Sequence, residues 1–516
     1  MKIRRLGSAI AGLATVVLLA TGCASSEADV AAAGGSDGDL VLARSADSTT
    51  LLPPTTTQNT DIWMLQQVYE TLTLNKSDGT GVEPGLATEW TESEDGLTWT
   101  FKIREGVKFH DGSALDAEDV KFSLDYARDT SNEANAWAGE FAPITDVVVI
   151  DDHTIDIELA ERWTPLPSFL ALFAASIYPS DFGGHDEAWM AENANGTGPF
   201  TFDSWTKGQS LKLVKNPEYW NSEQPKIDSV TFQVVPDDNT RMLQLQGGQV
   251  DVIEEPSATT MESLSTAEGV VAESFESTKL LYFNINNTVE GLDDPKVRRA
   301  LSYAVDRQSI VDTVLAGYAE PANSFISPGL PHHDDAVEGD VFDMALAQQT
   351  LAESGHPDGI PLEIQVASGI QDREQISQIA QAAWSELGFD VTVTPVDAAT
   401  FSSNRAAGNF QIQIGYATSD VVDTSQMVSF LALTDDAGIR SGYTNPEVYE
   451  KAAEAVTETD DAVRTKLYSE IQHIVEEEAP IIPIVFQPSL YAFSDDVEFA
   501  PGVLGTYGLR TATISE

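Results

Sequence analysis

The chain offers few side chains in arrangements that could do covalent or metal chemistry. Its 516 residues include one cysteine, Cys23, and seven histidines, which are scattered except in His332-His333-Asp334-Asp335. Imidazole and carboxylate groups in such a cluster can bind a transition metal. The cluster follows a segment rich in Pro and Gly, however, where polar residues are usually only solvated. The sequence contains no zinc-protease or phosphate-loop motif, and its one Gly-x-Ser-x-Gly match, at 34–38, lies before the first expected strand and lacks the strand–turn–helix setting of a nucleophile elbow. We therefore expect no metal, no cofactor and no enzyme activity.

Cys23 closes an N-terminal segment with the layout of an export signal. Three basic residues within the first five positions precede an apolar run at 10–20, and a glycine stands just before the cysteine. The run is too short to serve well as a permanent membrane anchor. The segment resembles a bacterial lipobox, in which the thiol is acylated and becomes the new N-terminus. Ala20 stands where leucine is commoner, and a secretory signal with a chance cysteine is the alternative.

The lipobox resemblance implies a signal peptide at 1–22 and a lipid-anchored protein. The anchor would hold it on the outer face of the cell membrane, or in the periplasm of a cell with two membranes. Residues 23–38 are mostly Ala, Gly, Ser and Asp, which cannot bury enough apolar surface to fold and predict a tether. The first strand is expected at 40–43.

Composition narrows the class of partner. The chain has 82 acidic and 28 basic residues, with a formal net charge of −54. Such a surface repels nucleic acid and anionic lipid headgroups, so we expect neither as a partner. With Cys23 lipidated, no thiol is left for a disulfide, a metal or catalysis. The length calls for more than one hydrophobic core.

Helices and strands are predicted to alternate as in α/β domains. The run 376–387 has an apolar stripe at three- and four-residue spacing, and Gly388 provides a left-handed stop before a strand at 389–393. Acidic residues placed to cap a helix, or a proline in its first turn, mark other helix starts. Further predicted helices are 117–126, 295–301, 343–354, 468–478 and one holding Trp63 and Tyr69; further strands are 99–103, 362–366, 410–416 and 481–485.

Four blocks, in order, resemble the extracellular solute-binding proteins of bacterial peptide and nickel ABC importers, family 5. Each block alone would be weak, but together they extend over most of the chain from about 40 to 486. They are Val68–Leu72 with Pro84–Ala87, Glu94–Phe101 and Gly106–Ser123; Gly196–Phe200 with Asn216–Trp220; Leu281–Asn284 with Val297–Leu301 and Ala304–Arg307; and Leu351–Gly355.

The resemblance implies a two-lobed α/β fold of the periplasmic-binding-protein type II class, as in large oligopeptide receptors, with solute bound in a cleft between the lobes. Lobe I would comprise 39–279 and 483–516, and lobe II 280–482. The chain would cross between them at Leu281–Asn284 and Ile481–Val485, so that a hinge needs backbone change at few positions. In this setting His110 and Gly196–Phe200 are expected to be structural, although the glycines could also form an anion-binding nest.

Peptide receptors of this family place an amine-binding aspartate just after a strand of lobe II. Here Asp420 and Asp423 follow the predicted strand at 410–416, and Tyr416 replaces the usual tryptophan. The resemblance therefore implies that Asp420, or else Asp423, meets the ligand's ammonium group. The alternative is that both aspartates cap or solvate a loop.

Two other regions are candidates for ligand contact. The loop before the first helix lines the cleft in similar receptors, which makes Asn59 and Thr60 expected contacts to the peptide backbone. A peptide carboxylate requires a cation, and Arg373, after the strand at 362–366, is the candidate. Its alternative is a solvated arginine on a helix surface.

These observations predict a monomeric substrate-binding lipoprotein that captures short peptides and delivers them to an ABC permease. The cargo could instead be a nickel chelate, an oligosaccharide, haem or another solute, because a fold does not dictate its ligand. An exported hydrolase is the remote alternative, since no nucleophile motif lies in the part of the chain that is expected to fold.

Overall fold

The structure is a computed structural model that describes residues 38–433 and 441–515. The predicted signal peptide, Cys23 and nearly all of the predicted tether lie outside the described residues. Among the described residues, no helix is both long enough and apolar enough to cross a membrane. Residues 34–516 form one compact unit.

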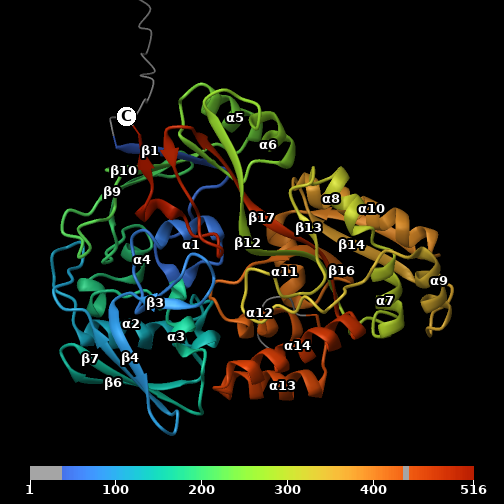
Figure 1. Cartoon of the computed structure of the whole chain (residues 1–516), viewed down its shortest axis with the longest axis horizontal. Helices are drawn as coiled ribbons and strands as arrows, with labels where there is room; N and C mark the ends of the chain where they lie inside the picture. Colours follow the sequence, from blue (N-terminus) through green and yellow to red (C-terminus); the bar gives the residue numbers. More distant parts are fainter. Residues whose placement is uncertain (1–37, 434–440, 516) are drawn as a thin grey trace, which may run out of the picture. The chain divides into compact units, whose positions relative to one another are not determined.

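One mixed sheet of eleven strands runs through this unit (Figure 1). Its centre is the antiparallel pair of the two longest strands, with parallel strands on either side. In spatial order the strands are β15 (Asp390–Val396), β14 (Pro361–Ala367), β16 (Ile412–Ala417), β12 (Val270–Ile285), β17 (Ile481–Ser494), β11 (Val252–Glu254), β1 (Asp39–Arg44), β10 (Ser229–Val234), β9 (Ser210–Lys215) and β8 (Phe200–Thr206), with β13 (Glu320–Pro321) beside β17.

Smaller sheets add to the N-terminal half and the C-terminus. An antiparallel sheet of four strands buries alternate residues, as the pattern at 99–103 predicted. Its strands, in spatial order, are β4 (Ala87–Glu92), β5 (Thr98–Ile103), β7 (Thr154–Leu159) and β6 (Ile144–Asp151). Two further pairs are β2 (Thr73–Asn75) with β3 (Val82–Pro84) and β18 (Val497–Glu498) with β19 (Thr513–Ile514).

The described helices are short to medium in length, and nine of them begin at an aspartate whose side chain accepts a hydrogen bond from the first turn. Part of the chain's acidity is therefore used for capping. The α-helices are α1 (Asn59–Leu65), α2 (Ala117–Ala127), α3 (Leu166–Phe169), α4 (Glu187–Met190), α5 (Asp238–Gln246), α6 (Ala258–Leu264), α7 (Pro295–Tyr303), α8 (Arg307–Thr313), α9 (Met344–Ala352), α10 (Gln371–Glu386), α11 (Ala398–Ala407), α12 (Thr424–Ala432), α13 (Pro446–Thr457) and α14 (Asp461–Glu478).

Most of the predicted elements are confirmed, with one correction. Helix α10 ends before Gly388, whose φ of +108° is the predicted left-handed stop, and β15 follows. The predicted helix that was to hold both Trp63 and Tyr69 is too long, because α1 ends at Leu65. The chain leaves the helix there because carbonyls of the next residues accept hydrogen bonds from the 196–200 segment instead of from helical N–H groups.

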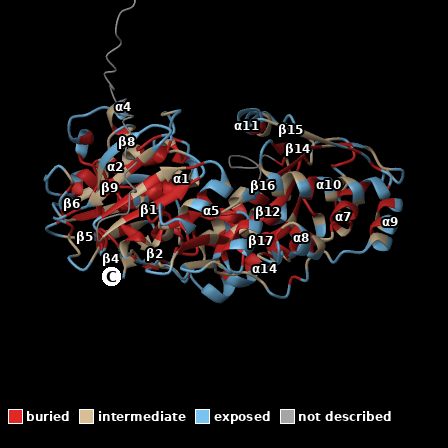
Figure 2. Cartoon of the chain, turned by 90° about the horizontal axis from the view of Figure 1, so that it is seen from above, coloured by how far each residue is buried: buried red, intermediate tan, exposed pale blue. Residues whose placement is uncertain are grey.

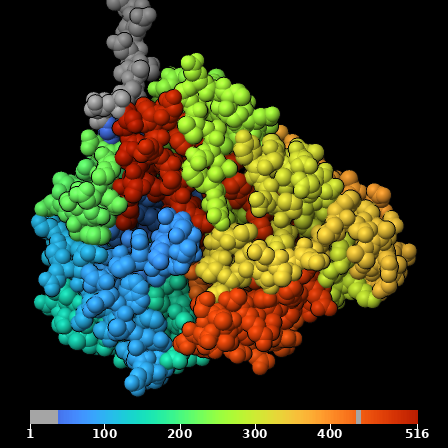
Figure 3. Space-filling model, in the orientation of Figure 1, coloured from blue at the N-terminus to red at the C-terminus, as the bar shows by residue number. Residues whose placement is uncertain are grey.

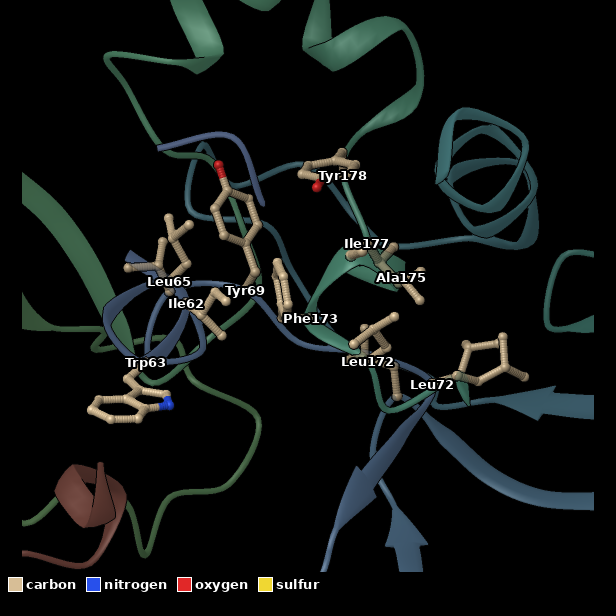
Figure 4. Close-up of a cluster of buried hydrophobic side chains, with 14 of the residues drawn as sticks. Ile62, Trp63, Leu65, Tyr69, Leu72, Leu172, Phe173, Ala175, Ile177 and Tyr178 are labelled. Carbon is tan, nitrogen blue, oxygen red and sulfur yellow. The ribbon is translucent and has the colours of Figure 1, made fainter. Parts of the chain in front are cut away.

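The Gly-Thr-Gly-Pro-Phe block packs directly on that turn, which confirms its structural interpretation. The N–H of Gly198 donates to the Val68 carbonyl at 2.9 Å, and a Cβ added at Gly198 or at Gly196 would meet the same oxygen at 2.6 or 2.2 Å. The turn continues into a buried aromatic cluster, in which Tyr69 lies edge-on to Tyr178 with ring centroids 5.3 Å apart (Figure 4). Only glycine allows the two backbones to approach this closely.

β12 and β17 are the strands that contain both predicted crossings. Their register pairs Leu281 with Val485 and Asn284 with Ile481, so the two crossings lie side by side in one ladder. The ladder is irregular between Phe275 and Lys279. β17 has buried residues on both sides of the irregularity, whereas β12 has them only from Ser277 onward (Figure 2).

Separate hydrophobic cores lie on the two sides of these strands. The largest core is formed almost wholly by residues of the predicted lobe I, and two others almost wholly by residues of the predicted lobe II. A few side chains cross over: Val421 joins the first core, while Val503 and Leu504 join one of the others. On the surface, a lobe II segment near 320–340, yellow in Figure 3, lies between lobe I residues near 80 and the orange-red helices α13 and α14.

Candidate functional site

The loop after β16 holds Asp420 at a fixed position. The N–H of Ser419 donates to Thr278 Oγ1 at 3.0 Å, and the N–H of Asp420 donates to Gln426 Oε1 at 2.8 Å. Gln426 is fully buried on α12, so it ties the loop to the core of lobe II. These bonds use the backbone of Asp420 and leave its half-buried carboxylate without a hydrogen-bond or ion-pair partner among the described residues.

A second unpaired carboxylate approaches Asp420 from lobe I. Glu140 lies in a short 3₁₀ helix (Ala138–Phe141), is half-buried, and has no cation beside it in the described part of the chain. Burial raises the pKa of Asp420 to about 7. Burial also raises the pKa of Glu140 to about 7, and the nearby charge of Asp420 adds to the rise. Two carboxylates in this arrangement favour a cation that donates hydrogen bonds to both.

Asn75, at the end of β2, connects lobe I to the same loop. Its Nδ2 donates to the Asp420 carbonyl at 3.3 Å, and its Oδ1 accepts from the N–H of Val422 at 3.3 Å. The Trp137 ring lies 6.5 Å from Phe430 of α12, measured between centroids. Polar and aromatic contacts thus connect the Asp420 loop and α12 with the segments that hold Asn75 and Glu140.

Asn59 and Thr60 lie in the first turn of α1, half-buried, where the helix has no side-chain cap. The structure connects this turn to Glu140 through Trp137, whose indole N–H donates to the Thr56 carbonyl at 2.7 Å. The Thr60 carbonyl accepts from Arg44 at 2.8 Å. The role of Asn59 and Thr60 in binding stays a prediction.

Tyr416 and Arg373 come together as a stacked pair. The Arg373 guanidinium carbon lies 4.7 Å from the centre of the Tyr416 ring, and 38% of Tyr416 remains exposed. Lys279 Nζ lies 5.9 Å from the centre of the same ring and forms an ion pair with Glu255 at 2.8 Å. Tyr416 is four residues before Asp420, so cationic groups and an anionic group flank one strand end.

Asp423 is used inside lobe II. One carboxylate oxygen caps α12 by accepting from Ser425 N–H at 2.9 Å, and the other pairs with Arg464 of α14 at 2.8 Å. The charge of Asp423 raises the pKa of Arg464 further, against the effect of burial. These contacts match the capping alternative for Asp423, and a ligand contact of this residue stays a prediction.

The histidines have structural contacts. His110 accepts from the Gly196 N–H at Nδ1 (3.3 Å), which leaves its Nε2 to donate to the Gly198 carbonyl (3.0 Å). Burial lowers its pKa to about 4, so it is neutral at pH 7. His332 and His333 bond in different directions, to Thr465 and to the Ile326 carbonyl. Within the described residues no group of three or more His, Cys, Asp or Glu is arranged to hold a metal.

Glu140 and Asn75 were not predicted from the sequence. Glu140 lies in a stretch with no motif, and its role depends on a contact with a residue 280 positions away along the chain. A Trp-x-x-Glu spacing alone carries no such signal. Only the fold brings these residues to Asp420.

Comparison with known proteins decides the family. The family model "Bacterial extracellular solute-binding proteins, family 5 Middle" matches residues 81–438, which is more than half of the chain. The chain belongs to family 5 of the bacterial extracellular solute-binding proteins. It is thus a solute-binding protein of an ABC importer family, as its sequence resemblance indicated.

Relatives extend this assignment over most of the chain. The glutathione-binding protein GsiB of Salmonella paratyphi A is 29% identical over 479 residues, covering 89% of this chain and 91% of GsiB. The Escherichia coli K12 GsiB is 29% identical over 425 residues, covering 80% and 82%.

Solved structures confirm the two-lobed family 5 fold. Helicobacter pylori DppA in complex with the peptide STSA has a TM-score of 0.83 at 23% identity, covering 93% of this chain and 98% of DppA. Brucella suis NikA in complex with Fe(III)-EDTA also has a TM-score of 0.83 at 23% identity, covering 93% of this chain and all of NikA. At this identity the likeness concerns the fold alone.

Proposed function

We propose that this family 5 protein is a lipid-anchored receptor that captures short peptides between lobe I and lobe II and delivers them to a membrane permease. The observation that carries the proposal is the pair of half-buried carboxylates, Asp420 and Glu140. Each lacks a cation among the described residues. A peptide's α-ammonium group supplies the positive charge and the N–H donors that this pair needs.

We propose further contacts between the solute and residues on both lobes. Tyr416 is four residues before Asp420, and Arg373, which stacks on Tyr416, would hold a carboxylate of the solute. From lobe I, Asn59 and Thr60 would contact the peptide backbone. Relatives named as glutathione-binding, and the solved complex of DppA with a peptide, support a peptide-like solute with an ammonium group.

Binding would work by lobe closure. We propose the lobe bounds 39–279 with 483–516 and 280–482, which the separate hydrophobic cores support. Solute that contacts both lobes stabilises the closed arrangement, because only that arrangement offers both sets of contacts. We further propose that Cys23 carries the lipid anchor, that the protein is a monomer, and that it catalyses no reaction.

Native mass spectrometry of residues 34–516 tests the proposal, since these residues form one compact unit. The protein should be purified without denaturation, beside the Asp420→Ala variant. We expect a mixture of peptide masses on the wild type that is lost from the variant. A single non-peptide mass would keep the receptor role and change its cargo, as the NikA complex with Fe(III)-EDTA illustrates for this fold. Cleavage of added peptide during incubation would instead identify a hydrolase.

A further inference from the structure

Two arginines of lobe II lack the partners that the other arginines have. The described chain contains twelve arginines, and ten of them donate to a carboxylate or to a backbone carbonyl through the guanidinium group. Arg373 and Arg405 do neither. Both are half-buried, and the Nε of Arg373 is fully buried with no hydrogen-bond partner.

These two arginines come from separate helices that pack on the same edge of the sheet. Arg373 is in the first turn of α10, and Arg405 is in the last turn of α11. Helix α11 lies beside β14 (Figure 2). Next to Arg405 in the sequence, Asn404 Nδ2 donates to Gln365 Oε1 of β14 at 3.2 Å. Helical side chains point back toward the helix N-terminus. Arg405 therefore extends toward the end of α11 that follows β15.

Both guanidinium groups act on one buried residue, Tyr282 of β12. Burial raises the pKa of the Tyr282 hydroxyl to about 12, and the charges of Arg405 and Arg373 both oppose that rise. Tyr282 pairs in register with Gly415, and its hydroxyl lies 3.8 Å from where a Gly415 side chain would begin. The charges of Arg405 and Arg373 therefore both act at β12, and Arg373 also contacts the adjacent strand β16 by stacking on Tyr416.

This arrangement is unfavourable unless anions complete it. Like charges repel, and half-buried guanidinium groups lose hydration that no carboxylate or carbonyl of the described residues replaces, although Arg373 stacks on the Tyr416 ring. The chain could supply carboxylates easily, because it has 82 acidic residues. Lys279, which lies beside Tyr416, illustrates this, since Glu255 pairs with it at 2.8 Å. Two arginines left open beside a paired lysine indicate a site built for anionic groups of a ligand.

We infer that Arg373 and Arg405 bind two carboxylates of one solute, so that the preferred cargo is a peptide or amino-acid conjugate with one ammonium group and two carboxylates. This inference rests on the proposed function, because it adds a second anion to the same solute. The charges then balance. The ammonium group meets Asp420 and Glu140, with one proton retained on that pair, and each carboxylate meets one arginine. A peptide with a single carboxylate would leave Arg405 unpaired.

Matched peptides test the inference on residues 34–516. Co-purified solute is first removed by reversible unfolding in guanidinium chloride, with circular dichroism to verify refolding. Isothermal titration calorimetry then compares tri-peptides that differ by a carboxylate or an isosteric amide. The pairs are Glu-Ala-Ala with Gln-Ala-Ala, Ala-Glu-Ala with Ala-Gln-Ala, and Ala-Ala-Glu with Ala-Ala-Gln. We expect at least one Glu peptide to bind tenfold or more tightly than its Gln partner.

Variants assign the preference to Arg405. Arg405→Gln should abolish the Glu-over-Gln preference and change binding of the Gln peptide less than twofold. Arg405→Lys should keep part of the preference, since it retains the charge without the two-pronged guanidinium. Lys215→Gln removes the same charge from the exposed end of β9 and should leave the preference intact.

Three results would overturn the inference. Equal binding within every pair, or a preference that survives Arg405→Gln, refutes it and leaves the peptide receptor standing. If no peptide in the panel binds the wild type, the proposed function fails and the inference fails with it.

Discussion

At the scale of single residues, Asp420 is the position where binding should be most sensitive. Asp420→Asn keeps the shape of the side chain but removes the charge that an ammonium group needs. We expect the affinity for a peptide ligand to fall about 10- to 100-fold, since a hydrogen bond to a charged group is worth roughly 1.5–3 kcal/mol. Glu133→Gln, an exposed neighbour of Glu140, is the control. Calorimetry on both variants decides, and an unchanged affinity in Asp420→Asn would remove Asp420 from the site.

The raised pKa values of the same pair predict a pH effect with a defined sign. Both folded-state values, about 7, lie above the ordinary values of 3.8 and 4.5. The ligand-free protein therefore loses stability as pH rises from about 4 to about 7, because the two carboxyl groups ionise more readily in the unfolded chain than in the fold. Glu140→Gln should be more stable than wild type at pH 8, by roughly 1–2 kcal/mol after allowance for partial exposure, and equal to it at pH 4.

Ligand affinity should show the opposite trend. An ammonium group binds the pair once it has lost one of its two protons, so affinity should rise with pH up to about 7 and weaken by about tenfold per unit below it. Urea unfolding and calorimetry between pH 4 and 8 measure the two trends. If stability and affinity were both independent of pH across this range, the two carboxylates would not be unpaired neighbours in solution.

At the scale of elements, the 196–200 segment should tolerate no side chain at its glycines. A Cβ at Gly198 would lie 2.6 Å from the Val68 carbonyl oxygen, which belongs to backbone and cannot swing away. Gly198→Ala should lower the free energy of unfolding by about 2–4 kcal/mol. Gly139→Ala is the matched control, because nothing lies within 4 Å of its added Cβ. Equal stability of the two variants in urea would show that the segment is looser than the structure indicates.

Asp423 connects α12 to α14, so its replacement should affect stability more than ligand binding. Asp423→Ala leaves Arg464 buried without its partner, which should cost about 3–5 kcal/mol of stability. Peptide affinity, measured below the unfolding transition, should stay within twofold of wild type. A stable Asp423→Ala variant with weakened binding would instead restore Asp423 as the amine contact.

Local patterns were sufficient for most elements and insufficient for the site. Caps such as Asp116, stops such as Gly388, and alternation along β5 act within a few residues, so a single sequence displays them. The end of α1 depends instead on hydrogen bonds from residues about 130 positions away, and the predicted helix was therefore too long. Glu140 could not be predicted for the same reason, because Asp420 is far from it in the sequence. Asp420 could be proposed only because a strand end that resembles the family's precedes it.

At the scale of the whole molecule, contacts between the lobes should control apparent affinity. Asn75 makes two hydrogen bonds to the Asp420–Val422 loop, and Thr164 of lobe I makes two more to the end of α13, from its N–H to the Val456 carbonyl (2.8 Å) and from its hydroxyl to the Glu458 carbonyl (3.0 Å). These bonds form only when the lobes face each other. They therefore favour the arrangement in which a solute meets both lobes at once.

A variant that removes one of these contacts should weaken binding, although the altered side chain does not contact the solute. Thr164→Val loses the hydroxyl bond and keeps the shape, so it should lower the closed fraction and raise the dissociation constant about two- to fivefold. The stability of each lobe should not change, because the bond joins the lobes and lies outside both cores. Small-angle X-ray scattering of the ligand-free protein should show a larger radius of gyration for Thr164→Val than for wild type, with the two converging at saturating peptide. Equal radii together with weakened binding would contradict closure as the cause, since the loss would then have to arise at the solute itself.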